Sequence, residues 1–207
     1  MGGALTVDAY LGLGSRYSYL ASTQLDRIAA ETGATINWIP IFGEELRPPD
    51  RDPFKGAPIS GQYDWNYRKQ DARAWAAFYR VPLREPVDRL EFEPRELVLA
   101  ALAAGHGQAR VAMMRRLFAA VFIEDRARID RAALAECAGE IGLDREAFAR
   151  ALDDDATEHE RVKITQEAKA RGVFGVPYFL VGDKAFFGND RLLLLEHHLK
   201  TLSASSA

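Results

Sequence analysis

The pattern of apolar and polar positions at the start of the chain predicts a strand, a helix and a second strand in succession. Apolar side chains occupy every second position from Leu5 to Leu13, as on the buried face of a strand. Residues 16–32 then carry apolar side chains at helical spacing, and Gly33 follows as a residue suited to end a helix. Segment 34–40, ATINWIP, is rich in β-branched and aromatic residues and is predicted to be the second strand.

Helical spacing dominates the middle of the chain. It begins after a connection rich in proline and charge, residues 41–61. Segments with the period of amphipathic helices follow, separated by Gly, Pro or Asp at their ends. These segments are 64–80, 94–105, 108–124, 130–142, 144–155 and 157–172.

The last part of the chain returns to strand spacing and closes with a helix. Segment 176–188, VPYFLVGDKAFFG, is predicted to form two strands joined by a two-residue turn at Gly182 and Asp183. Residues 189–202 are predicted to form a helix with Asn189 as its N-cap.

The order of these elements is that of a thioredoxin fold with helices inserted in its middle. We therefore expect an α/β protein whose thioredoxin-like domain is formed by residues 1–42 and 172–207. Residues 43–171 are expected to form an inserted all-helical domain.

Composition excludes several classes of partner. A net charge of −3 provides no basic field that would attract nucleic acid or an anionic membrane. No apolar run approaches the ~20 residues that span a bilayer, and the start of the chain lacks the basic region of a signal peptide. We expect a soluble, cytoplasmic protein.

The cysteine and histidine content argues against disulfide, dithiol and metal chemistry. The chain has one cysteine, Cys137, so an internal disulfide, a CxxC pair and a cysteine-based zinc cage are excluded. None of the four histidines has a histidine partner four residues away, and no metal is expected; they are His106, His159, His197 and His198.

The stretch GLGSRYS, residues 12–18, places Ser15 at the start of the first predicted helix, where backbone N–H groups are unpaired. A dinucleotide loop is disfavoured because Tyr17 stands at its third glycine. A serine-hydrolase elbow is disfavoured because Leu13 and Tyr17 flank Ser15 where small residues are needed. Two interpretations remain: a simple helix cap, favoured by the serine alone, and a donor to the thiolate of a bound thiol such as glutathione.

A second group of residues favours the thiol interpretation. Val176 and Pro177 come directly before the third predicted strand, where thioredoxin folds place a cis-proline. A cis-proline turns the main-chain N–H and C=O of the preceding residue outward, where they can pair with a peptide-like ligand. Asn189 and Asp190 open the last predicted helix, where N–H groups suit a carboxylate and Asp190 suits an ammonium group. Each signal alone is commonly structural, but their joint occurrence in this order indicates a glutathione site.

The segments GVFGVPYFLVGDKAFFGNDRLLLLEHHL and SRYSYLAS resemble the 2-hydroxychromene-2-carboxylate isomerases, members of the DsbA-like superfamily close to the kappa-class glutathione transferases. The segment YRKQDARAWAAFYRVPL is similar to a helix of that family and its following proline. The resemblance implies a DsbA/kappa-class architecture with glutathione bound between the two domains. It implies that Ser15 contacts the glutathione sulfur, that Val176 and Pro177 form the cis-proline segment, and that Asn189 and Asp190 hold the glutamyl end.

The resemblance also implies an activity, reversible addition of the glutathione thiol to a small aromatic carboxylate, followed by bond rotation and elimination to the isomer. The alternatives are a kappa-class-like transferase or peroxidase and a non-catalytic binding protein of the same fold. Arg16 replaces the proline usual after the catalytic serine, and the family's habit of dimerising suggests a homodimer. The residues expected to bind the substrate are Arg16, Tyr17, Lys55, Tyr67 and Arg73, with Trp65, Arg68 and Trp75 nearby.

Overall fold

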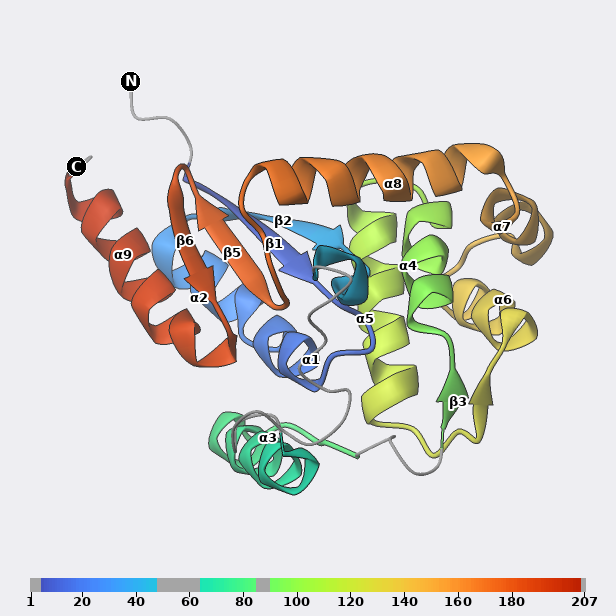
Figure 1. Cartoon of the computed structure of the whole chain (residues 1–207), viewed down its shortest axis with the longest axis horizontal. Helices are drawn as coiled ribbons and strands as arrows, with labels where there is room; N and C mark the ends of the chain where they lie inside the picture. The colour runs from blue at the N-terminus through green and yellow to red at the C-terminus, as the bar shows by residue number, and fades with distance from the viewer. Residues whose placement is uncertain (1–4, 48–63, 85–89, 206–207) are drawn as a thin grey trace.

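The computed structural model describes residues 5–47, 64–84 and 90–205, and its central element is a four-stranded mixed sheet (Figure 1). The strand order is β2-β1-β5-β6. Strand β1 pairs in parallel with β2 and antiparallel with β5, and β5 pairs antiparallel with β6. The strands span Thr6–Leu11 (β1), Thr35–Pro40 (β2), Tyr178–Val181 (β5) and Lys184–Phe187 (β6). The first and last parts of the chain therefore share one sheet, as the element order predicted.

The side chains of β1 alternate between two covered faces of this sheet. Val7, Ala9 and Leu11 are completely buried in the core cluster that includes α1, α2 and α9. Tyr10 lies on the opposite face, in a smaller cluster with side chains of α8 and η1. These elements span Arg16–Ser22 (α1), Leu25–Thr32 (α2), Leu192–Ser205 (α9), Asp155–Ala170 (α8) and Gly43–Leu46 (η1).

The segment between β2 and β5 forms a mainly helical region (Figure 1). Figure 1 shows α4 to α7 grouped at one end of the sheet and α8 extending from them along the sheet, whereas α3 lies apart and packs against α1. Helix α8 packs on both η1 and α4, so it joins this region to the sheet; the domain boundaries at residues 42 and 171 stay a prediction. The remaining helices span Trp65–Tyr79 (α3), Pro94–Ala103 (α4), Gln108–Phe122 (α5), Arg131–Glu140 (α6) and Arg145–Leu152 (α7).

Three details differ from the sequence prediction. The inserted region is not purely helical, because β3 (Glu91–Phe92) and β4 (Arg128–Ile129) form a short parallel pair. The helix predicted over 16–32 is interrupted after Ser22. The hydroxyls of Ser22 and Thr23 bond back to carbonyls of the preceding turn, an arrangement that competes with regular helix bonds.

The third difference concerns the start of the last helix. Asn189 is not its N-cap: a 3₁₀ turn, η3 (Asn189–Arg191), comes first, with Gly188 at φ 104° before it. The N–H of Arg191 closes this turn on the Gly188 carbonyl, and the Asn189 side chain points inward, only 2% of the residue being exposed. The predicted end of α2 is confirmed, since Gly33 adopts φ +71°, a conformation that favours glycine.

Candidate functional site

Ser15 caps helix α1 and keeps its own hydrogen available. Its Oγ accepts a hydrogen bond of 3.3 Å from the main-chain N–H of Ser18. A hydroxyl that accepts in this way can still donate one hydrogen bond, here from the start of a helix. Ser18 has a different role, because its buried Oγ accepts from the N–H of Gly12 at 3.1 Å and so holds the loop before the helix.

Ser15 and Val176 meet across Gly12. A Cβ placed on Gly12 would lie 2.8 Å from Cγ2 of Val176 and 3.6 Å from Cβ of Ser15. The peptide bond between Val176 and Pro177 is cis, as the resemblance implied. The glycine is therefore needed for the close approach of the two chain segments. Gly14 has a similar packing role against the ring of Phe92, so neither glycine of GLG requires a phosphate ligand to explain it.

The main chain around Val176 has unused hydrogen-bonding groups. Within the described residues, no hydrogen bond involves the N–H or C=O of Val176 or the N–H of Tyr17 in the first turn of α1. Main-chain N–H and C=O groups that are buried from water are nearly always paired in folded proteins. An extended peptide-like ligand lying along Val176 could pair with both of its groups.

The start of the last helix lies beside this edge. The N–H of Gly188 donates to the carbonyl of Pro177 at 3.0 Å, and η3 contacts α1. The main-chain N–H groups of Asn189 and Asp190 are used in no hydrogen bond of the described residues. The Asp190 carboxylate is about half exposed and lies 3.2 Å from Arg191. Asp190 is thus accessible to a cationic group, whereas the Asn189 side chain is enclosed beneath it.

A cluster of aromatic and charged side chains joins α1 to α3. The hydroxyl of Tyr17 donates to Asp71 at 2.7 Å. The guanidinium of Arg68 lies 4.9 Å from the Tyr17 ring centroid, and that of Arg16 lies 5.1 Å from the Trp65 ring centroid. Both distances are typical of cation–π contacts. Arg16 is buried beneath Trp65 rather than standing openly at the rim of the site.

Burial and neighbouring charges shift the pKa values of two residues in this cluster. Burial lowers the pKa of Arg68 from its ordinary value, and the positive charges of Arg16 and Arg47 lower it further. Burial, followed by the hydrogen bond and the negative charge of Asp71, raises the pKa of Tyr17 well above its ordinary value. Tyr17 is therefore a neutral hydrogen-bond donor at neutral pH.

The remaining substrate-site predictions divide into three groups. Tyr67, 54% exposed, and Arg73, also exposed, lie on α3, and neither joins the described contacts of Tyr17 with Asp71 and Arg68. Trp75 packs with Phe78 and Tyr79 and against the core, so it is a packing residue. Lys55 lies outside the described residues.

Sequence reasoning missed Asp71, Phe92 and Gly43. Asp71 follows Arg68 by three residues, so both occupy one helix face, and this spacing was a usable signal. Phe92 packs against Gly14, and Gly43 packs against Val176. No local sequence pattern predicts either contact.

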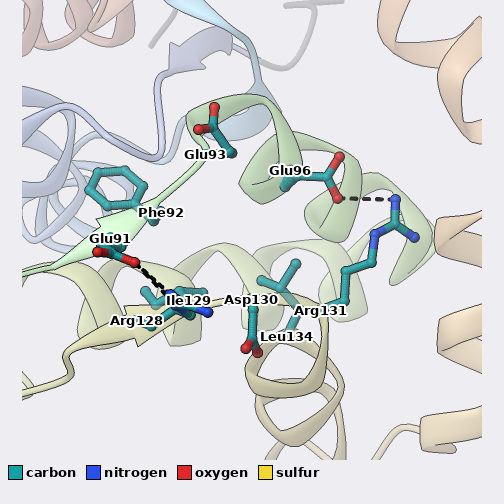
Figure 2. A pocket seen from close by; sticks show the side chains of 9 residues that line it. All are labelled: Glu91, Phe92, Glu93, Glu96, Arg128, Ile129, Asp130, Arg131 and Leu134. Atoms are coloured by element: carbon teal, nitrogen blue, oxygen red, sulfur yellow. Dashed lines mark hydrogen bonds and ion pairs between the residues drawn. The ribbon is translucent and has the colours of Figure 1, made fainter.

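Figure 2 shows a hollow of about 320 Å³ at the carboxyl ends of β3 and β4, where α4 and α6 begin. Its wall carries the ion pairs Glu91–Arg128 at 2.8 Å and Glu96–Arg131 at 3.2 Å. A second hollow of about 500 Å³ lies between β1 and α8. None of the residues predicted to bind glutathione lines either hollow, although Phe92 links the first one to Gly14.

The described residues offer neither a metal-binding cluster nor a membrane-spanning helix. Residues 5–47, 64–84 and 90–205 contain no group of three metal-ligating His, Cys, Asp or Glu side chains. No helix in these ranges combines the length and apolar character needed to cross a bilayer.

The close approach at Gly12 leads to a prediction for Gly12→Ala. The added methyl group would meet Val176 Cγ2, so we expect a loss of about 1–3 kcal/mol in the free energy of unfolding, measured by urea denaturation. In a Val176→Ala background the clashing methyl is absent, and Gly12→Ala is expected to cost much less. An equal cost in both backgrounds would contradict the packing explanation.

Comparison with known proteins agrees with this architecture. The DSBA-like thioredoxin domain family matches residues 6–200. A 2-hydroxychromene-2-carboxylate isomerase of Sphingobium xenophagum is 35% identical over 207 residues, covering 94% of this chain and 97% of the relative. One from Pseudomonas putida is 30% identical and covers 98% of both chains.

A solved structure supports the same relationship. A 2-hydroxychromene-2-carboxylate isomerase superposes with a TM-score of 0.83 at 29% identity, with 98% of each chain covered. The likeness thus includes the sheet, the cis-proline loop and the helical region together. Because sequence and fold agree over nearly the whole length, this chain belongs to the DSBA-like thioredoxin domain family and, within it, to the family of the 2-hydroxychromene-2-carboxylate isomerases.

Proposed function

We propose that this protein binds reduced glutathione and uses its thiol to isomerise 2-hydroxychromene-2-carboxylate or a similar aromatic carboxylate. The observation that carries the proposal is the meeting of Ser15 and Val176 across Gly12. It puts a hydroxyl donor at a helix start next to a main-chain edge with unused N–H and C=O groups. The family membership of the chain supports the same assignment.

The described residues fit glutathione as a ligand. The N–H and C=O of Val176 would pair with its peptide main chain, as an added strand does. The N–H groups of Asn189 and Asp190 would receive the glutamyl carboxylate, and the exposed Asp190 carboxylate would pair with the glutamyl ammonium. The Asn189 side chain, being enclosed, would support this turn rather than touch the ligand.

Ser15 would act on the sulfur. A free thiol has a pKa of about 8.5 and is mostly protonated at neutral pH. Lowering that pKa by about two pH units requires about 2.7 kcal/mol of preferential stabilisation of the thiolate. A charge-assisted hydrogen bond from the Ser15 hydroxyl, with the unused N–H of Tyr17 in the same helical turn, supplies donors of the required kind. Bound glutathione would supply a nucleophile that adds to a conjugated carbon and leaves after bond rotation.

The cluster between α1 and α3 would receive the substrate. Arg16 and Arg68 provide positive charge for an aromatic carboxylate, and Trp65 is about half exposed and offers a flat apolar surface. Tyr17 remains protonated because its pKa is raised, so it adds no negative charge that would repel an anion. The guanidinium groups of Arg16 and Arg68 are suited to an anionic substrate.

A calorimetric titration with reduced glutathione tests the cofactor assignment. We expect saturable binding together with the ultraviolet absorbance of a thiolate, because the site offers donors to the charged sulfur. S-methylglutathione is the control: it should bind through its peptide groups without the thiolate absorbance. If neither glutathione nor S-methylglutathione binds, the proposal is wrong, and a non-catalytic protein of the same fold is favoured. Binding without isomerisation of the chromene carboxylate would favour a conjugating transferase.

A further inference from the structure

Helix α8 carries a buried arginine that joins it to η1. Arg161 is 6% exposed, and its guanidinium forms two bonds to Glu158 on the same helix, of 2.9 Å from Nε and 2.8 Å from Nη2. Its third nitrogen, Nη1, donates to Glu45 of η1. A planar guanidinium held by two bonds to one carboxylate has a fixed orientation, so its remaining N–H groups point in a set direction.

One oxygen of Glu45 lies against two polar groups of α8. Besides Nη1 of Arg161, the hydroxyl of Thr165 lies 3.2 Å from Glu45 Oε2; it also lies 3.0 Å from the Arg161 carbonyl, and its one hydrogen serves either acceptor. The next residue, Leu46, is buried in the apolar cluster beneath α8 that also contains Tyr178. The polar bonds and the apolar contact together determine where η1 lies relative to α8.

Helix η1 in turn borders Val176. A Cβ placed on Gly43, the first residue of η1, would lie 3.1 Å from Val176 Cγ2. On its other side the same methyl group is packed against Gly12. The Val176 side chain is thus confined between the loop before Ser15 and the start of η1, and a shift of η1 would release it on one side.

We propose that Arg161 is a positioning residue for the glutathione site. Through Glu45 and η1 it holds Val176 against Gly12, so that the main-chain N–H and C=O of Val176 keep the orientation that an added strand requires. The inference rests on the proposed function, because glutathione is the ligand that this edge would pair with. It adds that a helix of the inserted region, distant in sequence from both Ser15 and Pro177, sets the affinity for glutathione without touching it.

The test measures glutathione affinity and the environment of Val176 in the same variants. Glu45→Ala removes the acceptor of Arg161, and we expect the dissociation constant to rise about threefold to tenfold, within the roughly twofold to thirtyfold range found for residues that act through others. The thiolate absorbance at saturating glutathione should stay at the wild-type level, because Ser15 is unchanged. The Val176 methyl resonances, observed by NMR in the free protein, should shift. Glu45→Gln, which keeps one acceptor oxygen, should give a smaller rise.

Arg110→Met is the matched control. Arg110 is also a largely buried arginine, joined to Glu160 of α8 at 2.9 Å, but it does not contact η1. It should lower stability without changing the dissociation constant or the Val176 resonances. Glu45→Ala with wild-type affinity and unshifted Val176 resonances would overturn the inference. If the wild-type protein bound no glutathione, the proposed function would fail, and the Val176 resonances alone would decide whether Glu45 positions this residue.

Discussion

Ser15→Ala is expected to lower the turnover of glutathione-dependent isomerisation by about 10²-fold to 10³-fold, the loss seen when one donor to a developing or stored negative charge is removed. The hydroxyl at the start of α1 and the Val176 side chain both lie beside Gly12, so an alanine at position 15 leaves the sulfur without its charge-assisted bond. The thiolate absorbance of bound glutathione should disappear at neutral pH, and its midpoint should move to higher pH.

Two controls separate this effect from the loss of the helix cap. Ser15→Ala also removes the acceptor for the Ser18 N–H, which costs about 0.5–2 kcal/mol of stability. Ser15→Thr keeps both the cap and the hydroxyl and should retain most of the activity. Ser22→Ala removes a hydroxyl from the other end of α1, where it bonds to the Tyr19 carbonyl, and should leave the thiolate unchanged. A Ser15→Ala protein with normal turnover would show that the serine is only a cap.

Phe122→Ala is expected to lower the free energy of unfolding by about 3–5 kcal/mol, the usual cost of truncating a buried aromatic ring. Phe122 is 1% exposed and stacks on Tyr19, with ring centroids 5.2 Å apart and an interplanar angle of 15°. Tyr19 belongs to α1 and Phe122 to α5, so this contact joins the helix that carries Ser15 to the inserted region. Urea denaturation of the two proteins measures the difference.

Phe78→Ala provides the matched comparison. Phe78 is 67% exposed on α3, so its removal should change stability by no more than about 0.5 kcal/mol. Phe122→Leu keeps most of the buried volume and should fall between the two. Equal losses for Phe122→Ala and Phe78→Ala would mean that the α1–α5 contact contributes little to the native state.

Local patterns were sufficient for most helices and strands. Apolar side chains alternate from Leu5 to Leu13 and follow helical spacing in the middle segments. This spacing indicates which face of each strand or helix is buried, and burial of that face stabilises the element. The same patterns did not predict the interruption of the helix after Ser22 or the 3₁₀ turn that begins at Asn189. Both depend on where a short polar side chain finds its partner, and that choice is made by the surrounding structure.

Some features of the candidate site could likewise be predicted from the sequence, whereas others depend on the tertiary structure. The chain itself placed Ser15 at a helix start and Val176 before a proline, because helix ends and X-Pro steps are properties of neighbouring residues. Only the tertiary structure decided that Val176 lies between Gly12 and Gly43, that Arg16 is buried beneath Trp65, and that Arg161 reaches Glu45. These contacts join residues far apart in sequence, and their geometry follows from how sheet and helices pack rather than from any local pattern.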